Sequence, residues 1–330
     1  MSKILVVGTL PSSIYNFRGE LLKLLKSQNL EVFSLASKAT STEVATIKQL
    51  GLGYIDYPVK RSGLSPKDDF KTFRVLRGIF KKHQPYVILA YTIKPVIWSG
   101  FAARCLPCCR FYALITGLGF AFQKGNWKNK LLMILIVFLY KKALKRADKV
   151  IFQNSDNRQV FIDLGIVPAY KTFIVNGSGV DISHYDVKPL SNSPNFLLIA
   201  RLLNAKGIRE YVKAANIVKE KYPKANFDLV GPEDPSPDGI SLVQLSELNS
   251  LNSVNYLGST DDVRPYIENC NIFVLPSYHE GLPRTVLEAM ATGRPILTTD
   301  VPGCRETVVD DKNGWLVEKA NVEHLAERMI

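Results

Sequence analysis

The chain has 330 residues, of which 46% are hydrophobic and 22% are charged, a composition typical of a soluble globular protein. Two domains are expected, because a single hydrophobic core rarely keeps growing beyond about 250–300 residues. The most apolar run, residues 131–140, has ten residues. That length excludes a membrane-spanning helix there, since a bilayer needs roughly 20.

The net charge of +12 is unevenly divided along the chain. Residues 1–180 hold 27 Lys and Arg against 9 Asp and Glu, a net charge of +18, whereas residues 181–330 hold 15 against 21, a net charge of −6. A basic half beside an acidic half predicts an anionic partner for the first half, namely nucleic acid, an anionic membrane surface or a diphosphate substrate.

The five cysteines give little sign of metal or redox chemistry. Cys105 and Cys108 have the C-x-x-C spacing, but no second pair and no nearby His completes a zinc site. Reduced thiols in a cytosolic protein are the simpler interpretation. The first residues lead directly into an apolar strand, so no signal peptide is expected and we predict a cytoplasmic location.

Short apolar runs alternate with amphipathic helical patterns throughout the first half. Strands are predicted at residues 4–10, 31–37, 54–59, 86–92, 110–117, 149–155 and 173–181, and helical patterns at 17–28, 43–51, 71–83, 98–106 and 129–147. This alternation predicts parallel strands joined by crossover helices, and thus a doubly wound α/β domain. The loop after the first strand has no G-x-G-x-x-G pattern, which argues against a nicotinamide enzyme.

The second half repeats the alternation after a stretch rich in Gly, Ser, Pro and Asn at residues 176–195. Such a composition is typical of a linker. The sequence therefore predicts a first domain at residues 1–180 and a second at 181–330.

Residues 271–303 combine two acids with a helix start. An apolar strand is predicted at 271–277, a helix at 285–292 and another strand at 295–303, with Gly281, Leu282 and Pro283 before the helix. The helix N-terminus then lies at the carboxyl end of a strand, where free N–H groups and the helix dipole favour a phosphate.

Glu280 and Glu288 frame this helix start. On a helix, Gly281, Arg284, Thr285 and Glu288 share one face. Our interpretation is that Glu288 accepts hydrogen bonds from vicinal hydroxyls such as those of a ribose, and that Glu280 does so for a sugar. The alternative is that Glu288 is a solvated carboxylate paired with Arg284 and that Glu280 is an ordinary loop acid.

Arg201 and Lys206 lie in a predicted loop between a strand and a helix. Both side chains could reach a diphosphate, Arg as a two-pronged donor and Lys as a point charge. Stabilising a departing diphosphate in this way is electrostatic catalysis. The alternative for both residues is a solvated surface loop.

These segments together resemble the donor-binding part of retaining glycosyltransferases of family 4, which have the GT-B fold. The similar segments are residues 196–215, 227–234, 254–277 and 271–303. In the first half, residues 12–25, 115–122 and 176–181 look most like bacterial members that extend polyprenyl-diphosphate-linked glycans for O-antigen, capsule and other surface polysaccharides or for protein glycosylation.

The resemblance implies two Rossmann-like domains facing across a cleft, the first binding the acceptor and the second the nucleotide sugar. The implied reaction moves a hexose or N-acetylhexosamine from a UDP-sugar to a lipid-linked glycan, with the leaving phosphate helping to deprotonate the acceptor. No metal or other cofactor is expected. The residues carried over are Glu280, Arg201 and Lys206 for catalysis, and Glu288, Gly281, Leu282, Pro283, Thr285 and Gly231 for donor binding. Family members usually continue with helices that pack back on the first domain, so the chain looks truncated at its C-terminal end.

The first domain offers weaker candidates. Many family members carry a His after a first-domain strand, and the matching place here is Thr116-Gly117, without a His. Backbone amides of that turn are expected to contact the sugar. Ser12 and Ser13, after the first strand, are candidates for a phosphate contact, and Arg18 is a candidate for the acceptor phosphate.

Residues 126–146 place basic flanks around an apolar centre. The flanking cations are Lys124, Lys128, Lys130, Lys141, Lys142, Lys145 and Arg146. Our interpretation is docking on the inner face of an anionic membrane; the alternative is a buried crossover helix with solvated ends.

Two other functions compete with glycosyl transfer. A GT-B-shaped sugar-nucleotide epimerase needs a cluster of carboxylates and His in the first half, which the sequence does not offer. A nucleic-acid-binding protein is disfavoured, because the basic residues are not interleaved with aromatics in a recognised module.

Overall fold

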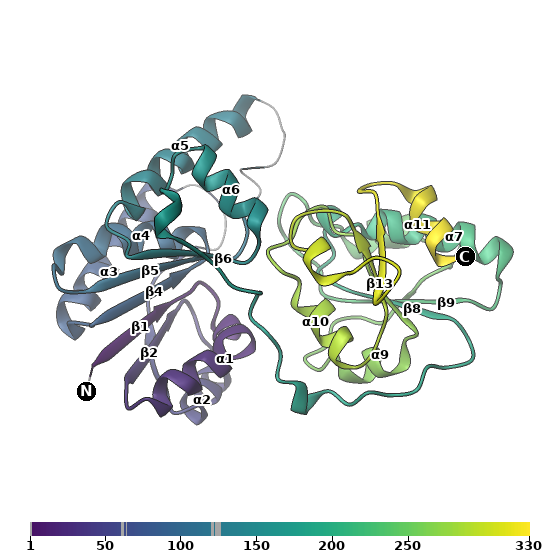
Figure 1. Cartoon of the computed structure of the whole chain (residues 1–330), viewed down its shortest axis with the longest axis horizontal. Helices are drawn as coiled ribbons and strands as arrows, with labels where there is room; N and C mark the ends of the chain where they lie inside the picture. The colour runs from purple at the N-terminus through teal and green to yellow at the C-terminus, as the bar shows by residue number, and fades with distance from the viewer. Residues whose placement is uncertain (1, 61–62, 64, 120–121, 123–126) are drawn as a thin grey trace. The chain divides into compact units, whose positions relative to one another are not determined.

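The computed structural model describes residues 2–60, 63, 65–119, 122 and 127–330. The chain divides into two compact units, residues 1–178 and 179–330. Each unit is one parallel sheet between two layers of helices (Figure 1). The predicted doubly wound α/β architecture is confirmed for both halves.

The sheet of the first unit has seven strands in the order β3-β2-β1-β4-β5-β6-β7, all parallel. Its strands are β1 (Lys3–Val7), β2 (Glu31–Ala36), β3 (Gly53–Asp56), β4 (Val87–Tyr91), β5 (Arg110–Ile115), β6 (Lys149–Phe152) and β7 (Thr172–Ile174). Its helices are α1 (Pro11–Ser27), α2 (Ser41–Gln49), α3 (Pro66–His83), α4 (Ile93–Ala102), α5 (Trp127–Leu144) and α6 (Ser155–Asp163).

The sheet of the second unit has six strands in the order β10-β9-β8-β11-β12-β13, again all parallel. Its strands are β8 (Asn195–Ile199), β9 (Asn226–Val230), β10 (Asn255–Tyr256), β11 (Ile272–Leu275), β12 (Ile296–Thr299) and β13 (Gly314–Val317). Its helices are α7 (Ile208–Lys221), α8 (Leu242–Leu248), α9 (Arg264–Asn269), α10 (Arg284–Ala291) and α11 (Val322–Met329).

Each sheet is buried on both faces, which explains why its central strands are apolar almost throughout. In the first unit, α1 and α2 pack in one core cluster, through Ile14 and Ile47, and α3 to α6 pack in the other. In the second unit, α7, α8 and α11 share one cluster, and α9 and α10 the other.

The strand order reverses between β1 and β4 in the first sheet and between β8 and β11 in the second. In sheets of this kind, ligands bind outside the carboxyl ends of the strands at such a reversal. The loops after these four strands are therefore the first place to look for function in each unit.

Candidate active site

A close approach between two loops brings Lys206 to Glu280. The loop after β8 ends in a short 3₁₀ turn, Asn204–Lys206, followed by Gly207 at a φ of +71°. A Cβ atom on Gly207 would lie 2.1 Å from the carbonyl oxygen of Pro276, so only glycine lets this loop lie against the end of β11. The ammonium of Lys206 pairs with the Glu280 carboxylate across that contact.

Glu280 is held firmly by its surroundings. The hydroxyl of Ser277 donates to the same carboxylate oxygen at 2.8 Å, and the Glu280 N–H donates to the Pro302 carbonyl at 3.1 Å. Burial and the negative charge of Glu280 raise the pKa of Cys304 to about 12, so that thiol stays neutral beside the site. Lys206 and Glu280 therefore form a mostly buried ion pair at the carboxyl edge of the sheet, rather than the solvated loop charges of the alternative interpretation.

Arg201 points to a different partner. Its guanidinium pairs with Asp234, in the loop that follows β9, and its side chain stays partly exposed. Burial opposes ionisation of Asp234, but hydrogen bonds with Ser236 and Arg201 outweigh it and hold the pKa of Asp234 below its usual value. Gly231 has a packing reason of its own, because a Cβ there would lie 1.7 Å from the Ala200 carbonyl oxygen.

Glu288 is buried on α10, and Arg284 Nε donates to its Oε1 at 2.8 Å. The alternative interpretation was a solvated carboxylate paired with Arg284. The pairing is present, but the carboxylate is buried. Helix α10 begins at Arg284 with Pro283 as the extended residue before it. The prediction that Gly281 shares a helical face with Glu288 is therefore wrong, because Pro283 is not helical and Gly281 lies before it.

The remaining donor candidates lie around this helix start. Gly281 and Pro283 are buried, and Leu282 and Thr285 are half-buried. All of them belong to the segment between Glu280 and Glu288. No ligand tests their assignment, so their roles stay predictions.

The predicted linker runs along α10 instead of standing apart from it. Burial and the nearby negative charge of Glu288 raise the pKa of Tyr185 to about 12, and the phenol hydrogen-bonds Glu288 and Arg284. A Cβ on Gly293 would lie 3.0 Å from a methyl of Val187. The buried guanidinium of Arg294 donates to the carbonyl of Lys188 at 2.9 Å. The turn-rich composition of this stretch gave no signal for these contacts.

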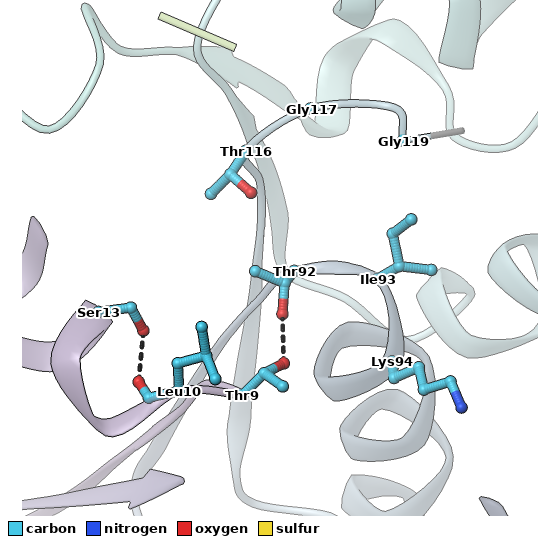
Figure 2. Close-up of a pocket in the computed structure, with 9 residues that line it drawn as sticks. All are labelled: Thr9, Leu10, Ser13, Thr92, Ile93, Lys94, Thr116, Gly117 and Gly119. Atoms are coloured by element: carbon cyan, nitrogen blue, oxygen red, sulfur yellow. Dashed lines mark hydrogen bonds between the residues drawn. The ribbon is translucent and has the colours of Figure 1, made fainter. Parts of the chain in front are cut away.

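The first unit has a cavity of about 360 Å³ at its own strand reversal (Figure 2). It lies at the carboxyl ends of β1, β4 and β5 and is lined by Thr9, Leu10, Ser13, Thr92, Ile93, Lys94, Thr116, Gly117 and Gly119. Hydroxyl groups dominate its polar side chains, which suits a ligand that offers hydroxyls in return.

Pairs of side chains fix this cavity. The hydroxyls of Thr9 and Thr92 lie 3.0 Å apart, and a dashed line marks this hydrogen bond in Figure 2. The Ser13 hydroxyl lies 2.8 Å from the Tyr91 hydroxyl. Thr92 has a φ of +68°, a costly conformation for a β-branched residue. Lys94, the cation among the lining residues that the structure describes, pairs with Asp69 at 2.9 Å. The described walls of the cavity are thus close to electrically neutral.

The first-unit candidates are only partly brought together. Ser13, Thr116 and Gly117 line the cavity, whereas Ser12 and Arg18 are not among its lining residues. Arg18 is buried, with its guanidinium 5.1 Å from the centre of the Tyr91 ring and NH1 donating to the Phe17 carbonyl at 3.1 Å. The candidates missed from sequence are Thr9, Thr92 and Lys94; their position just after β1 and β4, at the strand reversal, was the available signal.

Within the described part of the chain, no group of three or more His, Cys, Asp or Glu side chains is arranged to hold a metal ion. No helix among the described residues is both long enough and apolar enough to cross a bilayer. Whether the reaction needs a metal remains a prediction.

Two family models match the chain, and together they cover most of its length. Residues 3–154 match the "Glycosyl transferase 4-like" model, and residues 193–330 match the "Glycosyl transferases group 1" model. The two matches fall on the two structural units.

Full-length relatives agree with the family models. The chain is 32% identical to the N,N'-diacetylbacillosaminyl-diphospho-undecaprenol alpha-1,3-N-acetylgalactosaminyltransferase of Campylobacter jejuni, over 96% of this chain and 86% of that protein. It is 25% identical to the UDP-Gal:alpha-D-GlcNAc-diphosphoundecaprenol alpha-1,3-galactosyltransferase of Escherichia coli, over 79% of this chain and 70% of that protein. These comparisons give no support to an epimerase or a nucleic-acid-binding protein.

The fold is shared with solved glycosyltransferase structures. The Anabaena protein Alr3699/HepE, crystallised with UDP, superposes with a TM-score of 0.77 at 18% identity, over 100% of this chain and 89% of that one. With this fold, both family models and a relative matched along nearly the whole chain, the protein belongs to glycosyltransferase family 4 and is a glycosyltransferase with the GT-B fold.

Proposed function

We propose that the protein transfers a hexose or N-acetylhexosamine from a UDP-sugar to a polyprenyl-diphosphate-linked glycan, as a step in bacterial surface-polysaccharide or glycoprotein-glycan assembly. The names of the Campylobacter jejuni and Escherichia coli relatives describe acceptors of this class. Both names also specify an α-linkage, which is the outcome of retention when the donor sugar is α-linked to the nucleotide.

The buried pair of Lys206 and Glu280 is the observation that carries the donor assignment. When the bond between the sugar C1 and the diphosphate oxygen breaks, negative charge grows on the departing UDP. The Lys206 ammonium, already fixed at the strand ends, stabilises that charge without moving far. Glu280 holds the cation in place and accepts hydrogen bonds from sugar hydroxyls.

The remaining charged groups of the second unit have supporting roles in this proposal. Glu288, held in place by its hydrogen bond from Arg284, accepts hydrogen bonds from the two ribose hydroxyls. Arg201, in the same loop as Lys206, pairs with Asp234 and contributes positive charge to the diphosphate. With these cations and the N-terminus of α10, the site needs no metal ion.

The acceptor end sugar is assigned to the cavity of the first unit. Its hydroxyls, from Thr9, Ser13, Thr92 and Thr116, match the hydroxyls of a neutral sugar. In the transfer step the acceptor oxygen bonds to C1, the C1–phosphate oxygen bond breaks, and the acceptor proton passes to the departing phosphate. No protein base is needed for that proton.

The location follows from the acceptor. A polyprenyl-diphosphate glycan stays in the membrane, so we place the enzyme peripherally on the inner face of the cell membrane. The net charge of +18 on residues 1–180 supports an anionic surface as partner. Nucleic acid is not part of the proposal.

A donor and acceptor screen tests the proposal. The enzyme is incubated with UDP-sugars, with and without short polyprenyl-diphosphate-linked glycans, and UDP release and product mass are measured. We expect UDP release only when the lipid-linked acceptor is present, with a product heavier by one sugar residue. Interconversion of the UDP-sugar without acceptor would identify an epimerase instead.

A further inference from the structure

Helix α5 (Trp127–Leu144) is apolar on two opposite sides, but only one of them is packed. Ile136, Tyr140, Ala143 and Leu144 are buried in the core of the first unit, where α5 lies against α4. The outer side carries five large apolar side chains that are between 44% and 69% exposed: Trp127, Leu131, Ile134, Leu135 and Phe138.

The exposed side chains form one continuous stripe. Ile134 and Leu135 lie three and four residues after Leu131, and Phe138 lies four and three residues after them, spacings that place all four on a single face of the helix. Scattered exposed apolar residues are normal on a soluble protein, but a contiguous stripe over about two helical turns marks an interaction surface.

Basic residues surround the ends of the stripe. Lys130, Lys141, Lys142, Lys145 and Arg146 are exposed, and residues 127–147 contain no Asp or Glu. The Lys142 ammonium lies 5.5 Å from the centre of the Phe138 ring, so its stem covers apolar surface while its charge stays in water. Lys124 and the side chain of Lys128, also predicted in this basic flank, lie outside what the structure describes.

We propose that the stripe of Leu131, Ile134, Leu135 and Phe138 inserts into the interface of an anionic bilayer, with α5 parallel to the membrane plane. A stripe of apolar side chains edged by cations fits acyl chains below and anionic headgroups beside them. A protein partner or a second copy of this basic unit would have to bring acidic groups to both ends of the stripe. Membrane docking rests on the proposed function in one respect: a lipid-linked acceptor in the membrane is the reason for the enzyme to bind there.

If the stripe inserts, the free energy of membrane binding has an electrostatic contribution and a hydrophobic contribution. The cations attract anionic lipid, and salt screens that attraction. The apolar stripe contributes a part that salt does not screen. Binding is therefore expected to weaken as salt rises but to persist at high salt, which distinguishes insertion from charge attraction alone.

Vesicle sedimentation tests the stripe directly. The whole protein is mixed with vesicles of phosphatidylglycerol and phosphatidylcholine in low and high salt. Leu131→Gln, Ile134→Gln and Phe138→Gln together should lower partitioning by about a hundredfold at both salt concentrations. A matched control, Leu242→Gln with Val243→Gln, removes exposed apolar side chains from α8 and should bind like the wild type.

Charge is separated from insertion by a second variant. Lys141, Lys142, Lys145 and Arg146 replaced by Gln should weaken binding at low salt and leave the residual binding at high salt almost unchanged. Near-wild-type binding of the stripe variant would overturn the inference, as would complete release of the wild type by salt.

Lipid contact is measured by fluorescence. Brominated lipids quench tryptophan only at short range, so they should quench the wild type and fail to quench Trp127→Phe. Quenching that is equal in both proteins would place the contact elsewhere.

Two further measurements distinguish membrane insertion of the stripe from self-association and from a failure of the proposed function. A dimer that needs the stripe, seen by analytical ultracentrifugation without any vesicle binding, would assign the face to a second copy. The stripe variant should transfer sugar normally to a soluble short-chain acceptor and poorly to a membrane-bound one. Vesicle binding with no transfer to either acceptor would leave the docking face standing and refute the proposed function.

Discussion

The two units repeat one design and place charge in opposite ways. The order β3-β2-β1-β4-β5 of the first sheet matches the order β10-β9-β8-β11-β12 of the second. At the strand ends of the second unit, two cation–carboxylate pairs lie buried or half-buried, Lys206 with Glu280 and Arg284 with Glu288. At the same place in the first unit, the cavity is lined mainly by hydroxyls, and its Lys94 is neutralised by Asp69.

The contrast runs against the net charges of the two halves. Residues 1–180 carry +18 and residues 181–330 carry −6, yet the charged strand-end site belongs to the acidic half. A buried cation inside an acidic unit can bind one ligand at a defined position. A general excess of Lys and Arg instead attracts extended anionic surfaces. The net charge of a unit therefore predicts which kind of partner its surface attracts, but it does not predict where a binding site lies.

The largest expected effect comes from breaking the charged site of the second unit. Glu280→Ala removes the anchor of Lys206 and a sugar contact, so turnover should fall by about two orders of magnitude or more while the protein stays folded. Steady-state transfer rates and circular dichroism provide the measurement. Normal turnover would assign the pair a purely structural role.

Glu288→Ala should cost about two orders of magnitude in kcat/KM, because the ribose loses its acceptor and Arg284 loses its partner. Glu288→Gln keeps the shape and removes the charge, and should be milder. UDP affinity by calorimetry should fall with turnover. Unchanged UDP affinity would show that Glu288 does not contact the nucleotide.

A smaller effect is expected in the neutral cavity of the first unit. Lys94→Met leaves the mostly buried Asp69 carboxylate without its cation, which should lower the free energy of unfolding by about 1–3 kcal/mol. Asp69→Asn added to Lys94→Met should restore much of it. The midpoints of denaturant unfolding of the three variants check this, and a double variant no better than Lys94→Met alone would argue against the pair.

The smallest expected effect is that of a chelator. In the proposed donor site, Lys206, Arg201 and the start of α10 supply the positive charge for the diphosphate, so EDTA should leave the transfer rate unchanged. Loss of activity with EDTA and its return with Mn²⁺ would show that the charged site of the second unit is incomplete by itself.

The sequence was sufficient for the architecture, whereas the roles of the donor-motif residues stay predictions. Apolar runs between helical patterns identify the strands of the first sheet, most clearly central strands such as β1 and β4, which are buried and therefore apolar throughout. The exact start of α10 was not predictable, since Pro283 fits both the residue before a helix and its first turn. Tyr185 beside Glu288 was missed, because contacts between residues far apart in the sequence leave no local pattern. Ser277 was missed although it lies only three residues before Glu280, because a single Ser at a strand end has no distinctive pattern.

The alternatives for the residue 126–146 segment could not be separated from the sequence either. A buried crossover helix and a docking helix have the same composition here, and α5 proves to have a packed side and an open side. Which side of an evenly apolar helix meets the core depends on its neighbours and not on its own pattern.

The hydrogen bonds of Arg294 to the linker have a practical consequence for expressing the second unit as a fragment. The family model for the second unit begins at residue 193, but two of the three carbonyl groups that accept from this buried guanidinium belong to Lys188 and Pro189, and the third to Glu268. A fragment cut at the family boundary would leave a cation in the protein interior without the first two acceptors, a penalty of several kcal/mol. Expression of the second unit on its own should therefore start before Tyr185, so that the fragment retains the Lys188 and Pro189 carbonyl groups that accept from Arg294.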